Sequence, residues 1–209
     1  MRLRQRLPLI PLVLAIALAA GACTVPSPAP SEKTIAQQLL SDTGDNAAGF
    51  DDDWYDFDIA TQAILLYPDL VEAASDPSAS LTVFLPNDRA FQVLVYSLTG
   101  NVVLDEQGVF DAVASLGLPT VKTVLTYHIV GSKISATDAL AANGAELTTL
   151  QGGKLKVDVV NPALSLILLR DLDPNADDAG VVYSKFNYGG SLANGYIHGL
   201  SLVLRPADL

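Results

Sequence analysis

Cysteine, histidine and basic residues are all scarce in this chain of 209 residues. Its one cysteine, Cys23, rules out an intramolecular disulfide. The two histidines, His128 and His198, form no cluster with metal-site spacing, and the Gly-X-Ser-X-Gly motif of serine hydrolases does not occur. Only 12 Lys and Arg residues oppose 23 Asp and Glu residues, a charge balance that opposes binding to nucleic acid or anionic membranes. We therefore predict a protein that is not an enzyme, with no catalytic residues, no cofactor and no nucleic-acid partner.

The N-terminal segment has the pattern of a signal peptide. Three arginines within the first six positions precede an apolar run with two prolines over residues 7–20. This run is too short to remain in a membrane, because a spanning helix needs about 20 apolar residues. Small residues then lead to Cys23, and this ending resembles the lipobox of bacterial lipoproteins, although Ala20 stands where leucine is usual. We predict a signal peptide over residues 1–22, and its removal takes the formal charge from −11 to −14.

Cys23 is the predicted point of lipid attachment. Bacterial lipoproteins carry more than one acyl chain on this cysteine, which is what stable anchoring requires. Residues 23–31 then form a lipidated cysteine with a Pro/Ser-rich tether. The alternative is plain secretion after cleavage behind Ala22. In the preferred interpretation the domain lies outside the cytoplasm, lipid-anchored to the cell envelope, and contacts the membrane only through the lipid.

Periodicity predicts helices in the first part of the chain and strands mostly later. Helices are expected at residues 32–40, 57–67, 69–74, 88–97, 109–116, 121–125 and 134–142. Strands are expected at residues 81–85, 147–150, 155–160, 164–169, 181–186 and 196–204. Because the two types do not alternate regularly, we predict an α+β fold, with an N-terminal extension over residues 32–54 and a single domain over residues 55–209.

Three motifs resemble fasciclin-type (FAS1) domains, and they occur in the family's order. They are the segment from Thr82 to Phe91, the Tyr127-His128 pair, and the segment from Asn194 to Pro206. The matching residues are Thr82, Phe84, Pro86, Asn87, Phe91, Tyr127, His128, Asn194, Gly195, Ile197 and His198. Arg89 and Ser201 depart from acidic family positions, which puts in doubt any adhesion contact that relies on those acids.

The resemblance implies a small β-sandwich or wedge flanked by a helical layer. Fasciclin-like proteins are mostly extracellular adhesion modules, so the resemblance implies a non-enzymatic adhesion or protein-interaction module with a protein, extracellular-matrix or cell-surface partner. Some family members resemble carotenoid carriers, so the alternative is a carrier of an apolar small molecule such as a carotenoid or lipid. We interpret His128 and His198 as buried scaffold residues, since His198 shares a strand face with Leu200 and Leu202.

Acidic segments are the remaining candidates for a site. Asp171, Asp173, Asn175 and Asp177 place oxygens at alternate positions, as a calcium loop does, but Ala176 occupies the expected glycine position. We favour a solvated loop there and predict no metal site. Asp42, Asp45 and residues 51–53 lie in a predicted loop with no paired geometry. Trp54, Tyr55 and Phe57 are either a binding patch or the edge of the core, and we favour the core.

Overall fold

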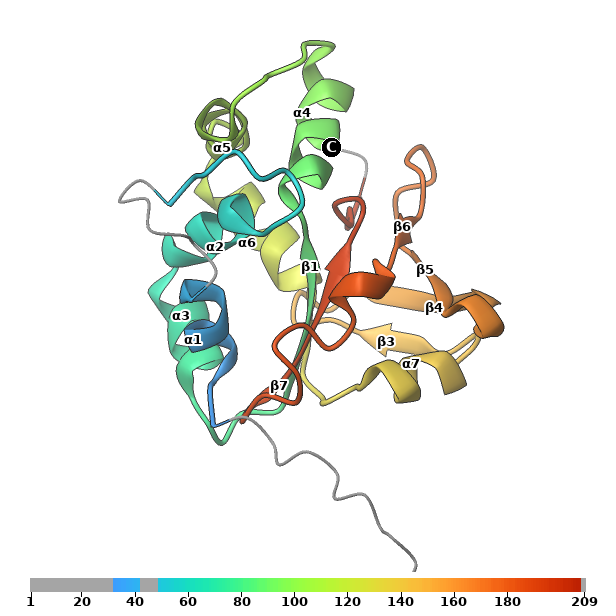
Figure 1. Ribbon diagram of the computed structural model, residues 1–209. Helices are drawn as coiled ribbons and strands as arrows, with labels where there is room; N and C mark the ends of the chain where they lie inside the picture. The colour runs from blue at the N-terminus through green and yellow to red at the C-terminus, as the bar shows by residue number, and fades with distance from the viewer. Residues whose placement is uncertain (1–31, 42–48, 208–209) are drawn as a thin grey trace, which may run out of the picture.

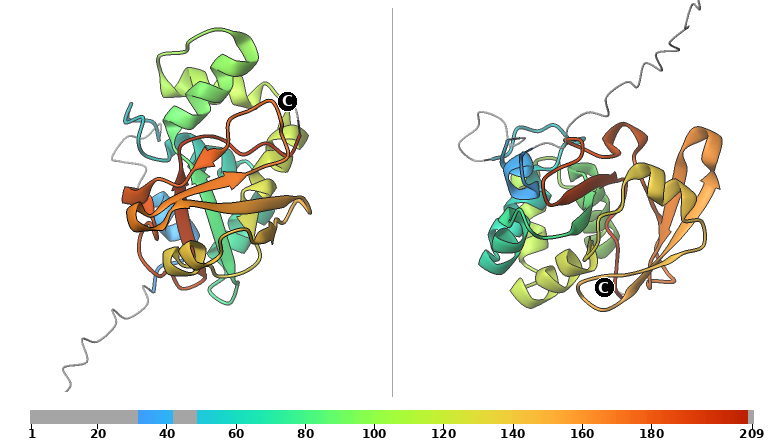
Figure 2. Two further views of the ribbon diagram at one scale, coloured as in Figure 1. Left: turned by 90° about the vertical axis from the view of Figure 1, so that its right-hand side faces the viewer. Right: turned by 90° about the horizontal axis from the view of Figure 1, so that it is seen from below.

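Strand β1 (Leu81–Pro86) runs through the middle of the molecule, and the other elements lie around it (Figure 1). The computed structural model describes residues 32–41 and 49–207. All six residues of β1 are buried, because helices cover one face of its sheet and a second sheet covers the other (Figure 2). The signal peptide, Cys23 and the tether lie outside the described residues, as do Asp42 and Asp45.

Helices form most of one side of the molecule (Figure 1). They are α1 (Ile35–Leu40), α2 (Asp58–Leu65), α3 (Pro68–Ser75), α4 (Asp88–Thr99), α5 (Glu106–Ala114) and α6 (Leu118–Tyr127). A further helix, α7 (Ala136–Ala141), lies on the other side of β1. Short 3-10 turns occur at Pro162–Leu164 and Tyr183–Lys185. Each lies close to an expected helix except the two turns. Helix α5 begins three residues earlier than expected, because the Asp105 side chain caps it by accepting a hydrogen bond from the Gly108 amide at 2.7 Å.

The strands of the described residues form two sheets. The first has the order β2-β1-β7, with β1 antiparallel to β2 (Ile129–Val130) and parallel to β7 (Gly195–Leu200). The second is antiparallel, in the order β3 (Glu146–Thr148), β4 (Lys154–Asn161), β5 (Leu166–Arg170) and β6 (Ala179–Gly180). Two packed sheets with a helical layer confirm the predicted α+β fold.

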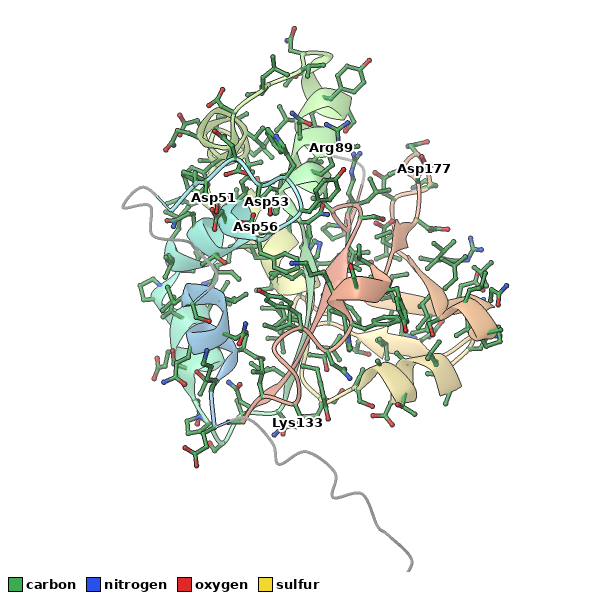
Figure 3. The ribbon with its side chains drawn as sticks, viewed as in Figure 1. Asp51, Asp53, Asp56, Arg89, Lys133 and Asp177 are labelled. Carbon is green, nitrogen blue, oxygen red and sulfur yellow. The ribbon has the colours of Figure 1, made fainter. Side chains whose placement is uncertain are left out.

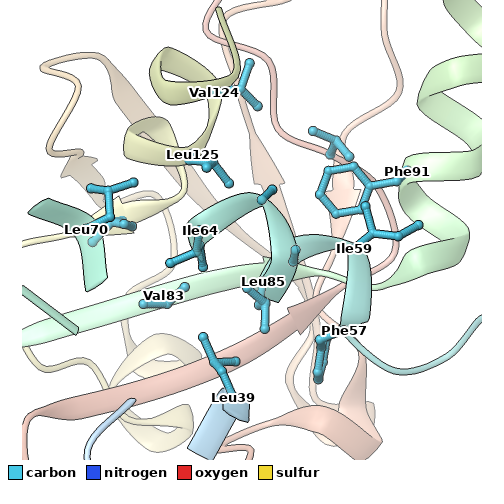
Figure 4. Close-up of a cluster of buried hydrophobic side chains, with 14 of the residues drawn as sticks. Leu39, Phe57, Ile59, Ile64, Leu70, Val83, Leu85, Phe91, Val124 and Leu125 are labelled. Carbon is cyan, nitrogen blue, oxygen red and sulfur yellow. The ribbon is translucent and has the colours of Figure 1, made fainter. Parts of the chain in front are cut away.

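Alternate residues of β1 divide the core into two clusters. Val83 and Leu85 point toward the helices, where they join side chains such as Ile59 and Phe91 (Figure 4). Phe84 points the other way, into the cluster that the second sheet completes. Helix α1 contributes Ile35 and Leu39 to the helical cluster, so part of the predicted N-terminal extension packs on the same core as the domain. Each such side chain contributes about 1.5–3 kcal/mol by leaving water.

The join between β1 and α4 follows the prediction. Pro86 is the last residue of the strand, and Asn87 caps the helix by accepting a hydrogen bond from the Ala90 amide at 2.9 Å. The Asn87 amide donates to the carbonyl oxygen of Leu200 at 3.1 Å, which ties the cap to β7. This cap is therefore part of the sheet as well as of the helix.

Two strand predictions are wrong in extent. In the strand expected over residues 181–186, the Val181 amide still donates to Ile167 of β5. The chain then leaves β5, because Val181 forms a single bridge to Leu200 and the Val182 amide donates to Gly199 of β7. A 3-10 turn follows instead of a strand. The strand expected over residues 196–204 ends at Leu200, since the amide of Leu204 donates to a histidine ring rather than to a neighbouring strand.

Candidate functional site

His128 follows α6, is buried, and is hydrogen-bonded at both ring nitrogens. Its Nδ1 lies 2.8 Å from the carbonyl oxygen of Val124, and its Nε2 accepts from the Leu204 amide at 2.9 Å. These partners assign the proton of the neutral ring to Nδ1. Burial lowers the pKa of His128 to about 4, against the smaller raising effect of the hydrogen bond to Val124. The ring is therefore neutral at pH 7 and links α6 to the C-terminal segment.

His198 lies fully buried on β7, where the first sheet faces the second. Its Nε2 lies 2.8 Å from the carbonyl oxygen of Ile134, and its Nδ1 accepts from the Asn187 amide at 3.3 Å. Burial lowers the pKa of this ring as well. On the adjacent strand, Thr82 Oγ1 donates to the carbonyl of Ser132 at 2.7 Å and accepts from the Ile134 amide at 2.8 Å. Both side chains thus hold the segment that precedes α7.

Asn194 joins three elements that are distant in sequence. Its Oδ1 accepts from the Ile35 amide at 2.9 Å, and its Nδ2 donates to the carbonyl of Ala74 at 2.8 Å. Gly195 then pairs with Leu81 at the start of β7, and a Cβ at this glycine would overlap the carbonyl oxygen of Leu81. Asn194 and Gly195 therefore fix β7 against β1, α1 and α3, which is more than the turn that the sequence suggests.

Tyr127 and the remaining motif residues also lie in the interior. The Tyr127 hydroxyl donates to the carbonyl of Lys154 at 2.8 Å, and burial raises the pKa of Tyr127 to about 12. Phe84, Phe91 and Ile197 are buried among apolar side chains. These contacts favour a scaffold role for the motif, which stays a prediction.

In the loop over residues 171–178, the carboxylates of Asp171 and Asp173 accept hydrogen bonds from protein donors. Asp171 accepts from the amides of Asp173 and Arg205, at 2.9 and 2.7 Å. Asp173 accepts from the Asn175 amide at 2.8 Å and lies 3.4 Å from the Arg205 guanidinium. Asp177 is exposed, on the side of the molecule away from the other labelled aspartates (Figure 3). Asp173 is only 5% exposed, so the solvated-loop interpretation is wrong for this residue. Within the described residues, no metal-compatible group of acidic side chains includes Asp171, Asp173 or Asp177, and the absence of a metal site in this loop stays a prediction.

The aromatic cluster before α2 is divided between core and surface. Phe57 is 1% exposed, and Trp54 packs against the helical core, as expected for the edge of a core. Tyr55 is 70% exposed, so the core interpretation is wrong for this residue. The difference arises because the chain turns at residues 54–56 before α2 begins.

A cluster of three buried carboxylates, which the sequence does not predict, lies where α2, α4 and α5 begin. Its members are Asp56, Asp88 and Glu106, with 8%, 0% and 0% exposure, and one ligand atom from each lies within 4.8 Å of the others. We call these three residues the carboxylate cluster. Figure 3 shows Asp56 beside Asp51 and Asp53, on the loop over residues 49–57.

Backbone amides hold Asp88 in place. Its two oxygens accept from the amides of Asp58 and Ile59 at 3.1 and 2.9 Å, so Asp88 caps α2 from a different helix. The Asp88 amide in turn donates to the carbonyl of Asp56 at 3.2 Å. The N-terminal residue of α4 therefore fixes both the start of α2 and the loop before it.

Glu106 is held through one oxygen only. Its Oε2 accepts from the amides of Asp51 and Asp52, at 3.1 and 3.0 Å, whereas its Oε1 is buried and has no hydrogen-bond partner in the described part of the chain. Asp56 Oδ1 is also buried and has no hydrogen-bond donor among the N–H and hydroxyl groups of the described residues. These two buried oxygens thus accept from no such group of the described residues, and the Asp56 side chain shares a hydrogen bond with the Asp88 carboxyl group.

Burial raises the pKa of every member of the carboxylate cluster. The pKa of Asp88 rises to about 10, through burial first and the hydrogen bond with Asp56 second. Burial is also the main cause for Asp56 and Glu106, and neighbouring acids add to it. Across residues 32–41 and 49–207, no ion pair reaches these three side chains. Without another positive charge, the cluster is stable only when it holds a proton.

The sequence carries one signal for this cluster. Asp56, Asp88 and Glu106 each stand at or just before the start of an α-helix, and acidic residues at helix starts are common for a local reason, the helix dipole. Only the tertiary fold brings the three starts together.

The cavities of the described residues are small or open. Enclosed apolar cavities beside His198 and beneath α6 measure about 10 and 20 Å³. A surface cavity of about 190 Å³ lies between α4 and the loop over residues 171–178, beside Arg205. Sites for small ligands typically measure about 300–1,000 Å³, so these cavities give the carrier alternative no support.

No single helix within residues 32–41 and 49–207 is long and apolar enough to cross a membrane. The pair α5 and α6 reaches that length and composition together, with a bend of 106° between the two helices. Both helices bury side chains in the helical core, including Val109 and Val121.

Comparison with known proteins identifies the architecture. The family model described as the fasciclin domain matches residues 57–206. The chain is similar to a solved pair of FAS1 domains from the insect cell adhesion molecule fasciclin I, with a TM-score of 0.58 and 16% sequence identity. That likeness covers 84% of this chain and 51% of the solved one, so the chain spans about half the length of that structure. No curated protein matches the chain in sequence.

Proposed function

Because the chain belongs to the fasciclin domain family, we propose that it is a non-enzymatic interaction module that binds a protein or cell-surface partner outside the cytoplasm. The match of the family model over residues 57–206 carries this proposal. The similar solved domains come from a protein named as a cell adhesion molecule, which supports an adhesive role. Both imidazole rings have protein partners at each nitrogen, which supports a role without acid–base catalysis.

A covalent lipid on Cys23 is the proposed anchor. Its position at the end of the signal-like segment, followed by a Pro/Ser-rich stretch, supports a tether between membrane and domain. The acidic domain would be repelled by an anionic membrane surface, so the lipid supplies all of the membrane attachment.

Replacement of the cysteine tests the anchor. We expect Cys23→Ala to move the full-length chain from the detergent-soluble membrane fraction to the soluble or secreted fraction. Thr24→Ala, which keeps the thiol, is the matched control and stays with the membrane. Membrane attachment of Cys23→Ala that survives a high-salt wash contradicts the proposal. A wild-type chain that is itself secreted, with Cys23 at its N-terminus, supports the alternative of plain secretion.

Crosslinking on intact cells tests the interaction itself. A membrane-impermeant, amine-reactive crosslinker is expected to join the wild-type chain to a surface protein and give an adduct of defined mass. Exposed Lys33, Lys133 and Lys156 offer reactive amines on the described domain. An accessible chain that reacts with the reagent but yields only its own mass contradicts a protein partner.

A further inference from the structure

We propose that the carboxylate cluster binds one calcium ion, which fastens the loop over residues 49–57 to α4 and α5. Two observations carry this assignment. Asp56, Asp88 and Glu106 bring three ligand atoms within 4.8 Å of one another. Independently, Glu106 Oε1 and Asp56 Oδ1 are buried oxygens without a hydrogen-bond partner in the described residues, on side chains that are more than nine-tenths buried.

The separation of the ligand atoms suits a single ion. Calcium binds oxygen at about 2.3–2.6 Å, so two of its ligands can lie up to roughly 5 Å apart. The three carboxylates of the cluster meet this limit. Asp51, which forms a second compatible group with Asp56, extends the set toward the surface, where solvent can complete the coordination.

The chemistry of the ligands selects a hard cation. Carboxylate oxygens are the ligands that calcium and magnesium prefer, whereas zinc and copper sites usually include histidine or cysteine. Both histidines of this chain have their ring nitrogens bonded to the backbone elsewhere. Magnesium usually takes one or two carboxylates and keeps most of its water. Three buried carboxylates from three chain segments therefore favour calcium.

The hydrogen bonds around the site leave acceptor capacity for the ion on Glu106 and Asp88. Glu106 uses Oε2 for the amides of Asp51 and Asp52, so both lone pairs of Oε1 remain available. Each oxygen of Asp88 accepts one amide, which leaves further acceptor capacity on that carboxylate. The ion satisfies buried oxygens that the described part of the protein leaves without a donor.

Binding has a local consequence for the surface. The 49–57 loop carries the exposed side chain of Tyr55 and is joined to α5 through the amides that Glu106 accepts. An ion shared by Asp56 and Glu106 makes this link resistant to opening. Calcium is therefore expected to order one specific segment. This effect distinguishes a specific calcium site from the non-specific binding of calcium to an acidic protein.

Calcium titration of the purified full-length chain in detergent, after treatment with EDTA, tests the assignment. We expect calorimetry to report one calcium ion per chain, and saturating calcium at about 100 times the dissociation constant to raise Tm by about 5–10 °C. Hydrogen exchange at the amides of Asp51 and Asp52 is expected to slow at least tenfold. Magnesium at equal concentration is expected to give a smaller shift in Tm.

Variants decide whether the cluster is the site. Glu106→Gln and Asp56→Asn each remove one charged ligand and are expected to abolish the calcium-dependent shift in Tm. The control Glu72→Gln, at an exposed position of α3, is expected to preserve the shift. Having two variants keeps the test valid if one of them fails to fold. The proposal is overturned if calcium up to about 10 mM, roughly ten times the weakest dissociation constants of extracellular calcium modules, leaves Tm and exchange unchanged. It is equally overturned if both cluster variants keep the full shift, or if magnesium alone stabilises the chain.

Discussion

The two histidines and the carboxylate cluster are both buried and polar, but their hydrogen bonding differs. Every ring nitrogen of His128 and His198 has a backbone partner at 2.8–3.3 Å. In the carboxylate cluster, by contrast, Glu106 Oε1 and Asp56 Oδ1 have none among the described residues. Each histidine also stays neutral, because burial lowers its pKa below the usual value.

This difference separates two uses of buried polarity. A polar group whose partners are all backbone atoms positions the chain and gains nothing from a ligand. A charged carboxylate that is buried without enough donors costs folding free energy, and binding of a proton or a cation removes that cost. The matching residues of the family motif belong to the first kind, whereas none of the three residues of the carboxylate cluster is among them, although Asp88 lies within the segment from Thr82 to Phe91.

The largest effect is expected from replacing Asn194, a side chain that is hydrogen-bonded at both its oxygen and its nitrogen. Asn194→Ala removes both partners of buried backbone groups, the Ile35 amide and the Ala74 carbonyl. Each group left unpaired costs about 1–3 kcal/mol, so we expect a loss of about 4 kcal/mol in the free energy of unfolding. Urea denaturation measures it. Asn101→Ala, at an exposed asparagine, is the control and changes stability by less than about 0.5 kcal/mol.

A loss below about 1 kcal/mol for Asn194→Ala would show that α1 and α3 are held by apolar packing alone. The contrast between the motif and the carboxylate cluster would then weaken, because a fully bonded motif residue would contribute no more to stability than an exposed one.

The second prediction concerns acid. The pKa of His128 is about 4 in the fold and about 6.5 when unfolded, so the unfolded chain binds the extra proton between these values. The stability that this neutral ring contributes is present above pH 6.5 and is lost as pH falls toward 4. The loss reaches about 3 kcal/mol.

Denaturation curves at pH 7.5 and pH 4.5 for the wild type and His128→Gln measure this contribution. The glutamine variant is expected to start less stable at pH 7.5 and to lose less stability on acidification. Parallel losses in both proteins would contradict the prediction, since other carboxylates would then account for all of the pH dependence.

Elements that depend on local chemistry could be predicted from the sequence. The order from β1 through the Asn87 cap to α4 follows from an apolar run, a proline, a capping residue and helical spacing. The α+β class follows from periodicity over long segments. The strands at residues 181–186 and 196–204 could not be delimited in this way, because crossing contacts with Gly199 and His128 end them.

The carboxylate cluster was beyond prediction for a similar reason. Asp56 and Asp88 are linked through the Asp88 amide, and Glu106 reaches the same place only because α5 packs beside α2 and α4. Each acid has an ordinary local explanation as a helix-start residue. The convergence depends on helix packing, which spacing along the chain does not encode.

The third prediction concerns the carboxylate cluster, where a substitution is expected to stabilise the fold and not to destabilise it as in the motif. In the presence of EDTA, Glu106→Gln is expected to raise the free energy of unfolding by about 1 kcal/mol, because it removes a buried charge beside Asp88 while an amide oxygen still accepts from the loop. The pKa of Glu106 is raised in the fold, so its acid form favours folding and that contribution is lost as pH rises. The gain from the variant therefore grows from pH 5 to pH 8.

Thermal denaturation in EDTA at both pH values measures this change, with Glu72→Gln as the matched loss of a charge on an exposed side chain. A destabilised Glu106→Gln without calcium would place the cluster with the fully bonded groups, and the contrast between the two regions would disappear.

The smallest expected effect is at Arg89, the exposed residue that follows Asp88 in the first turn of α4. Arg89→Glu places an anion near the positive end of the helix, which favours the fold by about 0.3–1 kcal/mol. The same charge repels the carboxylate cluster when that cluster carries no ion. We therefore expect the variant to have almost the same free energy of unfolding as the wild type in EDTA, and about 0.5 kcal/mol more in saturating calcium. The gain in calcium should fade at 1 M salt, which screens these charges. Equal values with and without calcium, measured by urea denaturation at low salt, would mean that no positive charge enters beside Asp88.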